Sequence, residues 1–556
     1  MGHFRPGDYD YVVGIDFGTT YSGCSFAYTG AGNKEIEDII RWPKQTHNVY
    51  CKTPTVLLYK CGAATTEWWG EDAYKNFWYA KGYLDKKLVT RFKLLLNNDS
   101  SVPELPPGLQ VEGVIRDYLK GFHKHVMLQL EHSLGSRYNP EKIRYCLTVP
   151  AGWSDQAKII MRGATINAGI IKSDDHPERL TLISEPEAAA LYCQKNCEEF
   201  NLTDGQQFLI CDAGGGTVDL VTFEISGDNS DRTLKEITTA RGENCGSTFL
   251  DWHMRNLLKE KISQHMVLSP ITLEEMTKSF VEKHKLMFGE NDERDGIFLE
   301  IPSAMYAADP AVLEKIGVDD YNLFFPYEEL MERVFEPVVS KVIHLIQQQL
   351  DHPEARKPMD AIFMVGGFSK SPYLERRIRE TFKDRVNIIS AAPRGELAVV
   401  RGAVLLGLQP TIVSQRIAKH TYGIETRSRF DCNEDPEEYR ITGTDFCDKR
   451  FNLIVKKNQK LPNNHVVSHN YTTSSTNKTV IAIYACDDDN VVPRWVRSTD
   501  GVALKQVGKF ILSAPASMTG DEIPLKVDFY FGKTEIKIDA HVLETTTTFT
   551  LAYANS

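Results

Sequence analysis

Two stretches of this sequence share one pattern of apolar and polar residues. In residues 10–28, the apolar run YVVGI leads into the turn DFGTT, and a second apolar run continues to Tyr28. In residues 206–225, the run FLIC leads into the turn DAGGGT, and alternation resumes at Val218. Each stretch therefore predicts a β-hairpin whose turn carries Asp, Gly and Thr. The aspartates that open the two turns, Asp16 and Asp212, lie 196 positions apart, which indicates two similar lobes.

Strands and helices alternate through the rest of the first 410 residues. Ser154 is an N-cap candidate for one of the helices. Strands alternating with helices predict sheets that are covered by helices. The expected strands are residues 143–149, 180–183 and 361–365, and the expected helices are residues 154–168, 187–193, 327–350 and 372–382.

The pattern changes after Leu408. From about Thr421 to Tyr553 the sequence consists of short alternating apolar segments separated by turn residues, as in VIAIYA at 480–485. This pattern predicts an antiparallel β domain. The sequence shows no helical segment after that domain.

Composition and charge exclude several classes of protein. The chain has 556 residues, of which 42% are apolar and 25% are charged, as in ordinary soluble proteins. Its net charge is −11 and it has no Lys/Arg-rich tract, so we expect no nucleic-acid partner. No apolar stretch is long enough to predict a membrane span. Eleven cysteines without a paired framework predict a reducing compartment, the cytoplasm, with the nucleus not excluded.

The turns of the two hairpins carry residues that suit a polyphosphate. Glycines in both turns would let backbone N–H groups approach phosphate oxygens with no Cβ in the way. Threonine hydroxyls add donors, and Asp16 and Asp212 would supply oxygen ligands, directly or through water, to Mg²⁺. Two such turns, one from each lobe, would hold a triphosphate between them. The sequence contains neither GxxxxGK[ST] nor GxGxxG, so neither a P-loop nor a Rossmann site is predicted.

These motifs resemble those of the heat-shock protein 70 family in the actin/hexokinase superfamily. DFGTTYS at 16–22 and DAGGGTVD at 212–219 are similar to its two phosphate loops. SEPEAAA at 184–190 and residues 397–408 are similar to its connecting segments, and VGGFSKSP at 365–372 is similar to its adenosine segment. TYGIET, which begins at Thr421, resembles the start of its substrate-binding β domain. The overall pattern is similar to the divergent heat-shock protein A12-like branch.

The resemblance implies ATP or ADP and Mg²⁺ as cofactors, and it implies roles for single residues. Asp16, Glu185 and Asp212 would surround Mg²⁺ and the attacking water. Thr217 would contact the γ-phosphate, and Asp219 would orient the γ-phosphate or the water. Phosphoryl transfer depends mainly on such positioning and on charge stabilisation.

A lysine should reach the γ-phosphate from the first lobe; Lys93 is the candidate and Lys87 the alternative. Glu282 and Lys285, three positions apart, are expected on one helical face toward the ribose. The implied nucleotide-binding residues are Gly18, Thr19, Thr20, Tyr21, Gly214, Gly215, Gly216, Thr217, Gly246, Glu282, Lys285, Gly366, Gly367, Lys370 and Glu396.

The chain departs from the family's pattern around the adenine. Lys370 stands where the family has an arginine that stacks on the base, and lysine stacks less well. Leu286 replaces a basic residue, and Glu396 replaces an aspartate. Phe368 replaces a serine and is expected to pack on the base instead. These changes concern adenine affinity rather than phosphate binding.

The expected fold is α/β, with a two-lobed, actin-like (ribonuclease H-like) ATPase domain followed by an antiparallel β domain without a helical lid. The switch proline of the family aligns with Pro150, and its partner arginine aligns with Lys158. The mixed segment 409–416 replaces the family's leucine-rich linker. The predicted domains are residues 1–412 and 413–556, with lobe I at about 10–205 plus 390–410 and lobe II at about 206–389.

The resemblance implies an Mg-dependent, ATP-hydrolysing chaperone that binds unfolded polypeptides under nucleotide control. Its further partners would be nucleotide-exchange or co-chaperone proteins. One alternative is a sugar-type kinase of the same superfamily, for which Asp155 is the candidate base. The other alternative is a nucleotide-gated scaffold with little hydrolysis.

Overall fold

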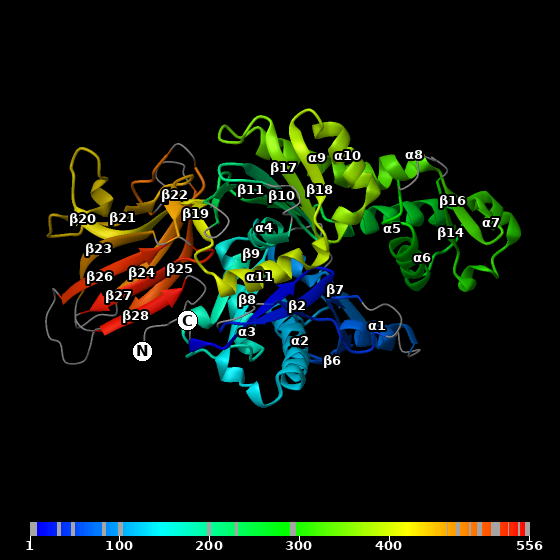
Figure 1. The fold of residues 1–556 in the computed structure, drawn as a ribbon, viewed down its shortest axis with the longest axis horizontal. Coiled ribbons are helices and arrows are strands. Elements are labelled where there is room, and N and C mark those ends of the chain that lie inside the picture. Colours follow the sequence, from blue (N-terminus) through cyan, green and yellow to red (C-terminus); the bar gives the residue numbers. More distant parts are fainter. Residues whose placement is uncertain are drawn as a thin grey trace.

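A computed structural model describes residues 8–30, 35–45, 50–79, 85–97, 104–196, 202–227, 232–289, 296–463, 465–473, 479–488, 491–496, 503–512, 523–531, 533–542 and 545–550. The chain has a mixed α/β architecture, as predicted. Two helix-covered sheets lie next to each other, and a β-rich C-terminal region lies to one side of them (Figure 1).

The first large sheet contains the first predicted hairpin. Its elements are β1 (Tyr11–Phe17), β2 (Tyr21–Tyr28), β3 (Glu37–Ile39), β4 (Thr53–Pro54), β8 (Ile143–Val149), β9 (Leu180–Ser184) and the helices α2 (Val111–Leu134) and α3 (Asp155–Asn167). The strand order is β3-β2-β1-β8-β9, with β4 paired to β2. β1 and β2 are antiparallel, whereas β8 and β9 extend the sheet in parallel. Alternate β1 residues, among them Val13 and Phe17, are buried against α2 and α3.

The second large sheet repeats this arrangement around the second hairpin. Its elements are β10 (Gln207–Ala213), β11 (Val218–Ser226), β12 (Thr233–Glu236), β13 (Arg241–Glu243), β17 (Met359–Val365), β18 (Val386–Ala391), β19 (Val413–Ile417), β22 (Lys460–Pro462) and the helices α5 (Thr248–Ser263), α9 (Glu336–Leu350) and α10 (Pro372–Phe382). The β10–β11 hairpin is antiparallel, and β17 and β18 follow in parallel, just as β8 and β9 follow β1. Both sheets therefore contain an antiparallel hairpin whose first strand is followed by two parallel strands.

Two helices, α4 (Glu185–Asn196) and α11 (Ala398–Leu408), lie between the large sheets. Their apolar residues share one buried cluster with both sheets, including Val12 of β1 and Ile210 of β10. The helices can approach closely because Gly402 has no Cβ. A Cβ there would lie only 1.7 Å from the carbonyl oxygen of Ala188. The small residues of these segments therefore serve close packing between the two sheets.

Smaller elements extend from both sheets. They are β5 (Val56–Lys60), β6 (Thr66–Trp69), β7 (Lys86–Thr90) and α1 (Gly70–Tyr79), and then α6 (Pro270–Lys283), β14 (Ile297–Glu300), α7 (Pro310–Ile316), β15 (Val318–Asp319), β16 (Asn322–Phe325) and α8 (Tyr327–Leu330). The single regular helix predicted for residues 327–350 is wrong in detail, because a π-helical turn, Met331–Phe335, separates α8 from α9. The wider turn ends two residues before Pro337, which has no N–H to donate to the preceding turn.

Glu336 begins α9 and binds three neighbouring side chains. Its carboxylate accepts hydrogen bonds from Arg377 (2.7 Å), Ser340 (2.7 Å) and the Tyr373 hydroxyl. The hydrogen bond from Arg377 is the main reason that its pKa is lowered to about 2, against a smaller opposing effect of burial.

We predict that Glu336→Gln lowers the free energy of unfolding by about 1–2 kcal/mol at pH 7, allowing for partial exposure. A carboxylate whose pKa is lowered by folding stabilises the folded protein fully at pH values above its ordinary pKa of 4.5. This stabilisation is lost as the pH falls toward 2, so the difference between the proteins should shrink on acidification. Urea unfolding at pH 7 and pH 3 measures this, with the exposed Glu332→Gln as the matched control. An equal effect at both pH values would contradict the ion-pair explanation.

The C-terminal region consists of antiparallel strands. Its strands are β20 (Thr421–Arg429), β21 (Phe446–Val455), β23 (Val466–Thr473), β24 (Thr479–Cys486), β25 (Leu504–Leu512), β26 (Ile523–Tyr530), β27 (Lys537–Val542) and β28 (Thr545–Thr550). They form two four-stranded sheets, β21-β20-β24-β25 and β23-β26-β27-β28, over one shared apolar core.

The predicted domain boundary at 412/413 falls beside strands of the second large sheet. β19 pairs with β12 in parallel, and β22, from within the C-terminal region, pairs with β19. The segment that replaces the family's linker is therefore partly a sheet strand. Among the helices that the structure describes, none combines the length and the apolar character needed to cross a membrane.

Candidate functional site

The opening aspartates of the two predicted turns occupy equivalent places in the two large sheets. Asp16 lies near the end of β1 opposite Gly23, and Asp212 lies near the end of β10 opposite Asp219. Asp16 and Asp212 are each 5% exposed. Each hairpin thus places a buried carboxylate directly before a glycine-containing turn.

The two turns face and touch each other. A Cβ on Gly215 would lie 2.4 Å from Oγ1 of Thr20, and a Cβ on Gly216 would lie 2.3 Å from Oγ1 of Thr19. Within the first turn, a Cβ on Gly18 would lie 2.1 Å from the carbonyl oxygen of Tyr21. Glycine is therefore required by close approach at these positions.

The second turn is held by the start of α5. The backbone N–H groups of Gly246, Ser247 and Thr248 donate to carbonyl oxygens of the turn glycines at 2.8–3.1 Å. A Cβ on Gly246 would lie 2.7 Å from the carbonyl oxygens of Gly214 and Gly215. The predicted residue Gly246 thus packs against the phosphate-loop candidate itself.

Four carboxylates and two lysines come together beside the turns. Nζ of Lys93 lies 2.5 Å from Oε1 of Glu185, and Nζ of Lys52 lies 2.6 Å from Oδ2 of Asp16. Lys93, in the 3₁₀ helix Phe92–Asn97, is 3% exposed, whereas the alternative, Lys87, is exposed on β7. Only Lys93 of these two candidates is therefore placed in the cluster.

Burial and like charge act on the carboxylates together. Burial raises the pKa of Glu185 to about 7, although the Lys93 ammonium opposes the shift. Burial, assisted by Glu185 and Asp219, holds the pKa of Asp212 well above its ordinary range. Buried carboxylates that lie close together favour binding of a cation, because the cation relieves the repulsion between their negative charges.

Asp219 leaves one oxygen for a ligand. Its Oδ1 accepts a hydrogen bond from the backbone N–H of Gly152 at 3.3 Å. Its Oδ2 is buried and accepts no hydrogen bond shorter than 3.5 Å among the described residues, while the Thr217 hydroxyl lies close to the carboxylate. Thr217, 7% exposed, begins the returning side of the same turn. An orphaned buried oxygen beside a hydroxyl fits a site that binds a further polar group.

The donor set fits Mg²⁺ held jointly with a polyphosphate. In the described ranges, no three His, Cys, Asp or Glu side chains converge closely enough to hold a metal ion by themselves. Mg²⁺ usually keeps several waters and uses one or two carboxylates together with substrate phosphates. Asp16 and Asp212, each beside a glycine-containing turn, match that mode of binding, and Glu185 lies beside them.

The predicted adenosine segment follows β17. Gly366 has φ +84°, and a Cβ there would lie 2.6 Å from Oδ1 of Asp212, whereas Gly367 faces open space. Lys370 and Glu396 form an ion pair at 3.2 Å, and the carboxylate is the more buried partner. The expectation that Phe368 packs on the base is wrong, because its side chain is 1% exposed within the core of the second sheet.

The predicted helical pair Glu282–Lys285 is wrong, because α6 ends at Lys283. Glu282 pairs with Lys278 on the helix surface at 3.7 Å. Lys285 is 7% exposed, and its Nζ lies 2.8 Å from Oδ1 of Asp251. The two residues therefore face different surroundings.

Three charged residues of the site lie outside the set predicted from the sequence: Lys52, Asp251 and Arg91. Asp251, in α5, pairs with Lys285, and its other oxygen lies 2.9 Å from Nη2 of Arg91, which follows β7. Arg91 thus links the element before Lys93 to the second sheet. None of the three lies in a recognisable motif, and their partners are 34 to 160 residues away.

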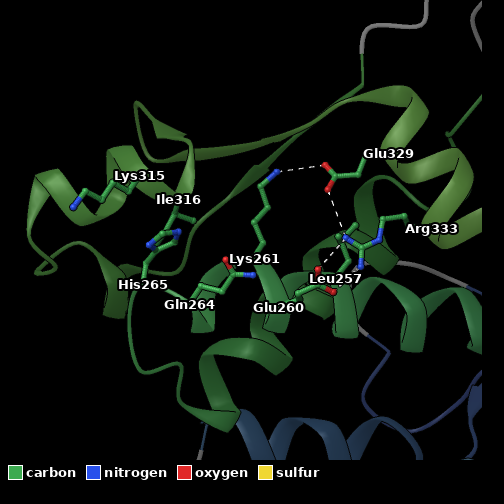
Figure 2. A pocket seen from close by; sticks show the side chains of 9 residues that line it. All are labelled: Leu257, Glu260, Lys261, Gln264, His265, Lys315, Ile316, Glu329 and Arg333. Atoms are coloured by element: carbon green, nitrogen blue, oxygen red, sulfur yellow. Dashed lines mark hydrogen bonds and ion pairs between the residues drawn. The ribbon is translucent and has the colours of Figure 1, made fainter.

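A separate surface cavity of about 210 Å³ lies by α5, away from the hairpins (Figure 2). Its charged side chains largely satisfy one another: Lys261 pairs with Glu329 at 3.4 Å, and Arg333 with Glu260 at 2.6 Å. This cavity contains none of the predicted site residues.

Comparison with known proteins finds similar sequences over most of the chain. Residues 202–390 match a family model described as a domain of unknown function (DUF8340). The chain is 25% identical to human heat shock 70 kDa protein 12A, over 95% of this chain and 89% of that protein. It is 24% identical to human heat shock 70 kDa protein 12B, over 96% and 90% of the two chains. It is also 24% identical to the chaperone protein DnaK of Metamycoplasma hominis, over 75% and 62%.

Proposed function

Because the predicted resemblance to the heat-shock protein 70 family and its 12A-like branch is confirmed, we propose that this chain binds ATP and Mg²⁺ between the two hairpins, hydrolyses ATP and acts as a chaperone. The observation that carries the proposal is the contact of two glycine turns beside four buried carboxylates and Lys93. We infer a two-lobed, actin-like domain at residues 1–412, with a substrate-binding-like domain at 413–556.

The chain's own residues supply positioning and charge. The turn glycines would admit the phosphates, and Thr19, Thr20 and Thr217 would donate hydroxyl hydrogen bonds to them. Asp16, Glu185 and Asp212 would hold Mg²⁺, directly or through water; when bound, that ion would neutralise charge on the phosphate oxygens.

The buried groups beside the phosphates would prepare the attack of water. The ammonium of Lys93, paired with Glu185 at 2.5 Å, would face the γ-phosphate. The unpartnered Oδ2 of Asp219 would accept a hydrogen bond from the attacking water and so orient it. Phosphoryl transfer needs little more than this positioning and charge stabilisation.

The nucleoside would lie against Gly246, Gly366 and Gly367. Lys285 is the candidate for the ribose, with Tyr21 directly after the first turn. The ion pair between Lys370 and Glu396 would border the base.

The C-terminal region contacts elements next to the proposed site. Arg162 of α3, 2% exposed, is bound by Glu535 through Nη2 at 2.6 Å and Nε at 3.0 Å. Lys158, in the place of the family's switch arginine, donates to the carbonyl oxygen of Thr534 at 3.2 Å. Lys419 donates to the carbonyl oxygen of Ala151, the residue before Gly152, whose N–H binds Asp219. These contacts support communication between the ATP site and a bound polypeptide.

The kinase alternative gains little support from Asp155. Its carboxylate is paired with Lys158 at 3.2 Å and accepts a hydrogen bond from the hydroxyl of Tyr422 at 3.4 Å. A general base needs access to the hydroxyl of its substrate. The scaffold alternative is favoured by one observation, the Lys370–Glu396 ion pair, because a paired ammonium stacks poorly on adenine.

We predict that Asp212→Ala lowers the rate of phosphate release from Mg-ATP by about 100-fold or more, because it removes a carboxylate that would position Mg²⁺. Release is measured for the purified protein alone and with an unfolded peptide. We expect peptide-stimulated release in the unchanged protein and none in the variant.

Asp174→Ala, at an exposed position, is the matched control and should leave release unchanged. ATP binding without turnover under either condition would favour the nucleotide-gated scaffold. A rate of phosphate release that the peptide does not change, together with no peptide binding by the protein, would contradict the chaperone function. A phosphorylated metabolite in a screen would favour the kinase.

Cytoplasmic exchange factors or co-chaperones are the further partners that the proposal implies.

A further inference from the structure

Lys52 places an ammonium group inside the carboxylate cluster. It lies directly before β4, its side chain is 11% exposed, and its Nζ lies 2.6 Å from Oδ2 of Asp16. The backbone around it is held, since Gln45 Nε2 donates to the carbonyl oxygen of Lys52 at 2.8 Å and Trp42 Nε1 donates to that of Cys51 at 3.1 Å. The cation is therefore positioned by the fold rather than free in solvent.

A glycine on the neighbouring strand makes room for this side chain. Gly23 pairs with Asp16 across β1 and β2. A Cβ on Gly23 would lie 2.9 Å from Cγ, 3.3 Å from Cε and 3.5 Å from Cδ of Lys52. The lysine stem thus passes over the one position of the strand that directly faces Asp16, and it does so only because that position carries no side chain.

The charge of the cluster explains what such a cation does. Asp16, Glu185, Asp212 and Asp219 are all at most 7% exposed, and Lys93 is already engaged by Glu185. A polyphosphate brought to this cluster adds further negative charge in a place where water screens poorly. An ammonium has three donors, so Lys52 can keep Asp16 and still donate to a phosphate oxygen.

We propose that Lys52 is a built-in cation of the phosphate site, which lowers the dependence of nucleotide binding on divalent metal. Its ammonium offsets the repulsion between Asp16 and the phosphates, part of the task that Mg²⁺ performs when bound. This inference rests on the proposed nucleotide site between the two hairpins. Lys52 acts here on binding, and no step of the hydrolysis is assigned to it.

The test is calorimetric titration of ATP into the full chain, once with excess Mg²⁺ and once with EDTA and no divalent metal. With EDTA, we expect Lys52→Met to bind ATP at least about ten-fold more weakly than the unchanged protein. With saturating Mg²⁺, we expect the two to differ by less than about three-fold, because the metal supplies the missing charge. In EDTA, Lys52→Arg should bind ATP nearly as tightly as the unchanged protein, since it keeps the positive charge.

Two further variants separate charge from folding. Lys60→Met, at an exposed lysine on β5, should leave binding unchanged in both conditions. Gly23→Ala displaces the lysine stem but keeps the charge, so it should weaken binding in EDTA more than in Mg²⁺, even if Lys52→Met folds poorly. Equal metal dependence in Lys52→Met, Gly23→Ala and the unchanged protein would overturn the role of Lys52. An unchanged protein that binds no ATP in Mg²⁺ would overturn the nucleotide site itself, and this inference with it.

Discussion

Gly216→Val is expected to weaken binding of Mg-ATP by about 100-fold or more. A Cβ at this position would lie 2.3 Å from Oγ1 and 2.8 Å from Cβ of Thr19, and 2.8 Å from Cδ2 of Leu94. Rotating the Thr19 hydroxyl away cannot remove the contact with its Cβ. The valine would therefore push the two turns apart, and the proposed phosphate site lies between them.

Calorimetric titration with Mg-ATP measures this loss, and Gly163→Val is the matched control. Gly163 lies in α3, and a Cβ there meets nothing within 4 Å, so this variant should bind normally. A thermal melt verifies that both variants are folded. Unchanged affinity in folded Gly216→Val would mean that nucleotide does not bind between the hairpins.

Lys93→Met is expected to lower the rate constant of ATP hydrolysis by about 100-fold or more while changing nucleotide affinity by less than about five-fold. The substitution removes the ammonium that would stabilise charge on the transferred phosphoryl group. It also leaves Glu185 buried without its partner, which raises a pKa that burial already brings to about 7. Part of the carboxylate that would help to hold Mg²⁺ would then be protonated.

Single-turnover hydrolysis separates this effect from binding, and Lys87→Met is the matched control. Lys87 was the alternative candidate in the sequence, but it is exposed on β7. Its removal should leave hydrolysis within about two-fold of the unchanged protein. If Lys87→Met lost hydrolysis and Lys93→Met kept it, the assignment of the lysine would be reversed.

Much of the fold could be predicted because its signals are local. The hairpins of β1–β2 and β10–β11 follow from apolar runs on either side of Asp-Gly-Thr turns, and the change to antiparallel β structure after Leu408 follows from period-two alternation. The helix α3 begins as predicted at the N-cap Ser154, whose hydroxyl accepts from the N–H of Ala157 at 3.3 Å.

The errors concern residues whose place is set by distant neighbours. Phe368 is apolar, so it could pack either on a bound base or in a hydrophobic core. In the structure it packs in the core beside the second sheet. Glu282 and Lys285 have helical spacing, but the helix ends between them, and Asp251 of another helix holds the lysine. The mixed segment 409–416 takes the place of the family's linker, and its composition does not show that β19, which begins within it, pairs with β12.

The sequence by itself determined that glycine, threonine and aspartate lie together in each turn, because residues within one short hairpin stay close whatever surrounds them. Only the tertiary structure decided which charges join them. Lys52 reaches Asp16 over Gly23, and Lys93 reaches Glu185 from 92 residues away. The physical reason is that a buried charge is tolerated where a counter-charge meets it, and that meeting is fixed by how the sheets pack, not by spacing along the chain.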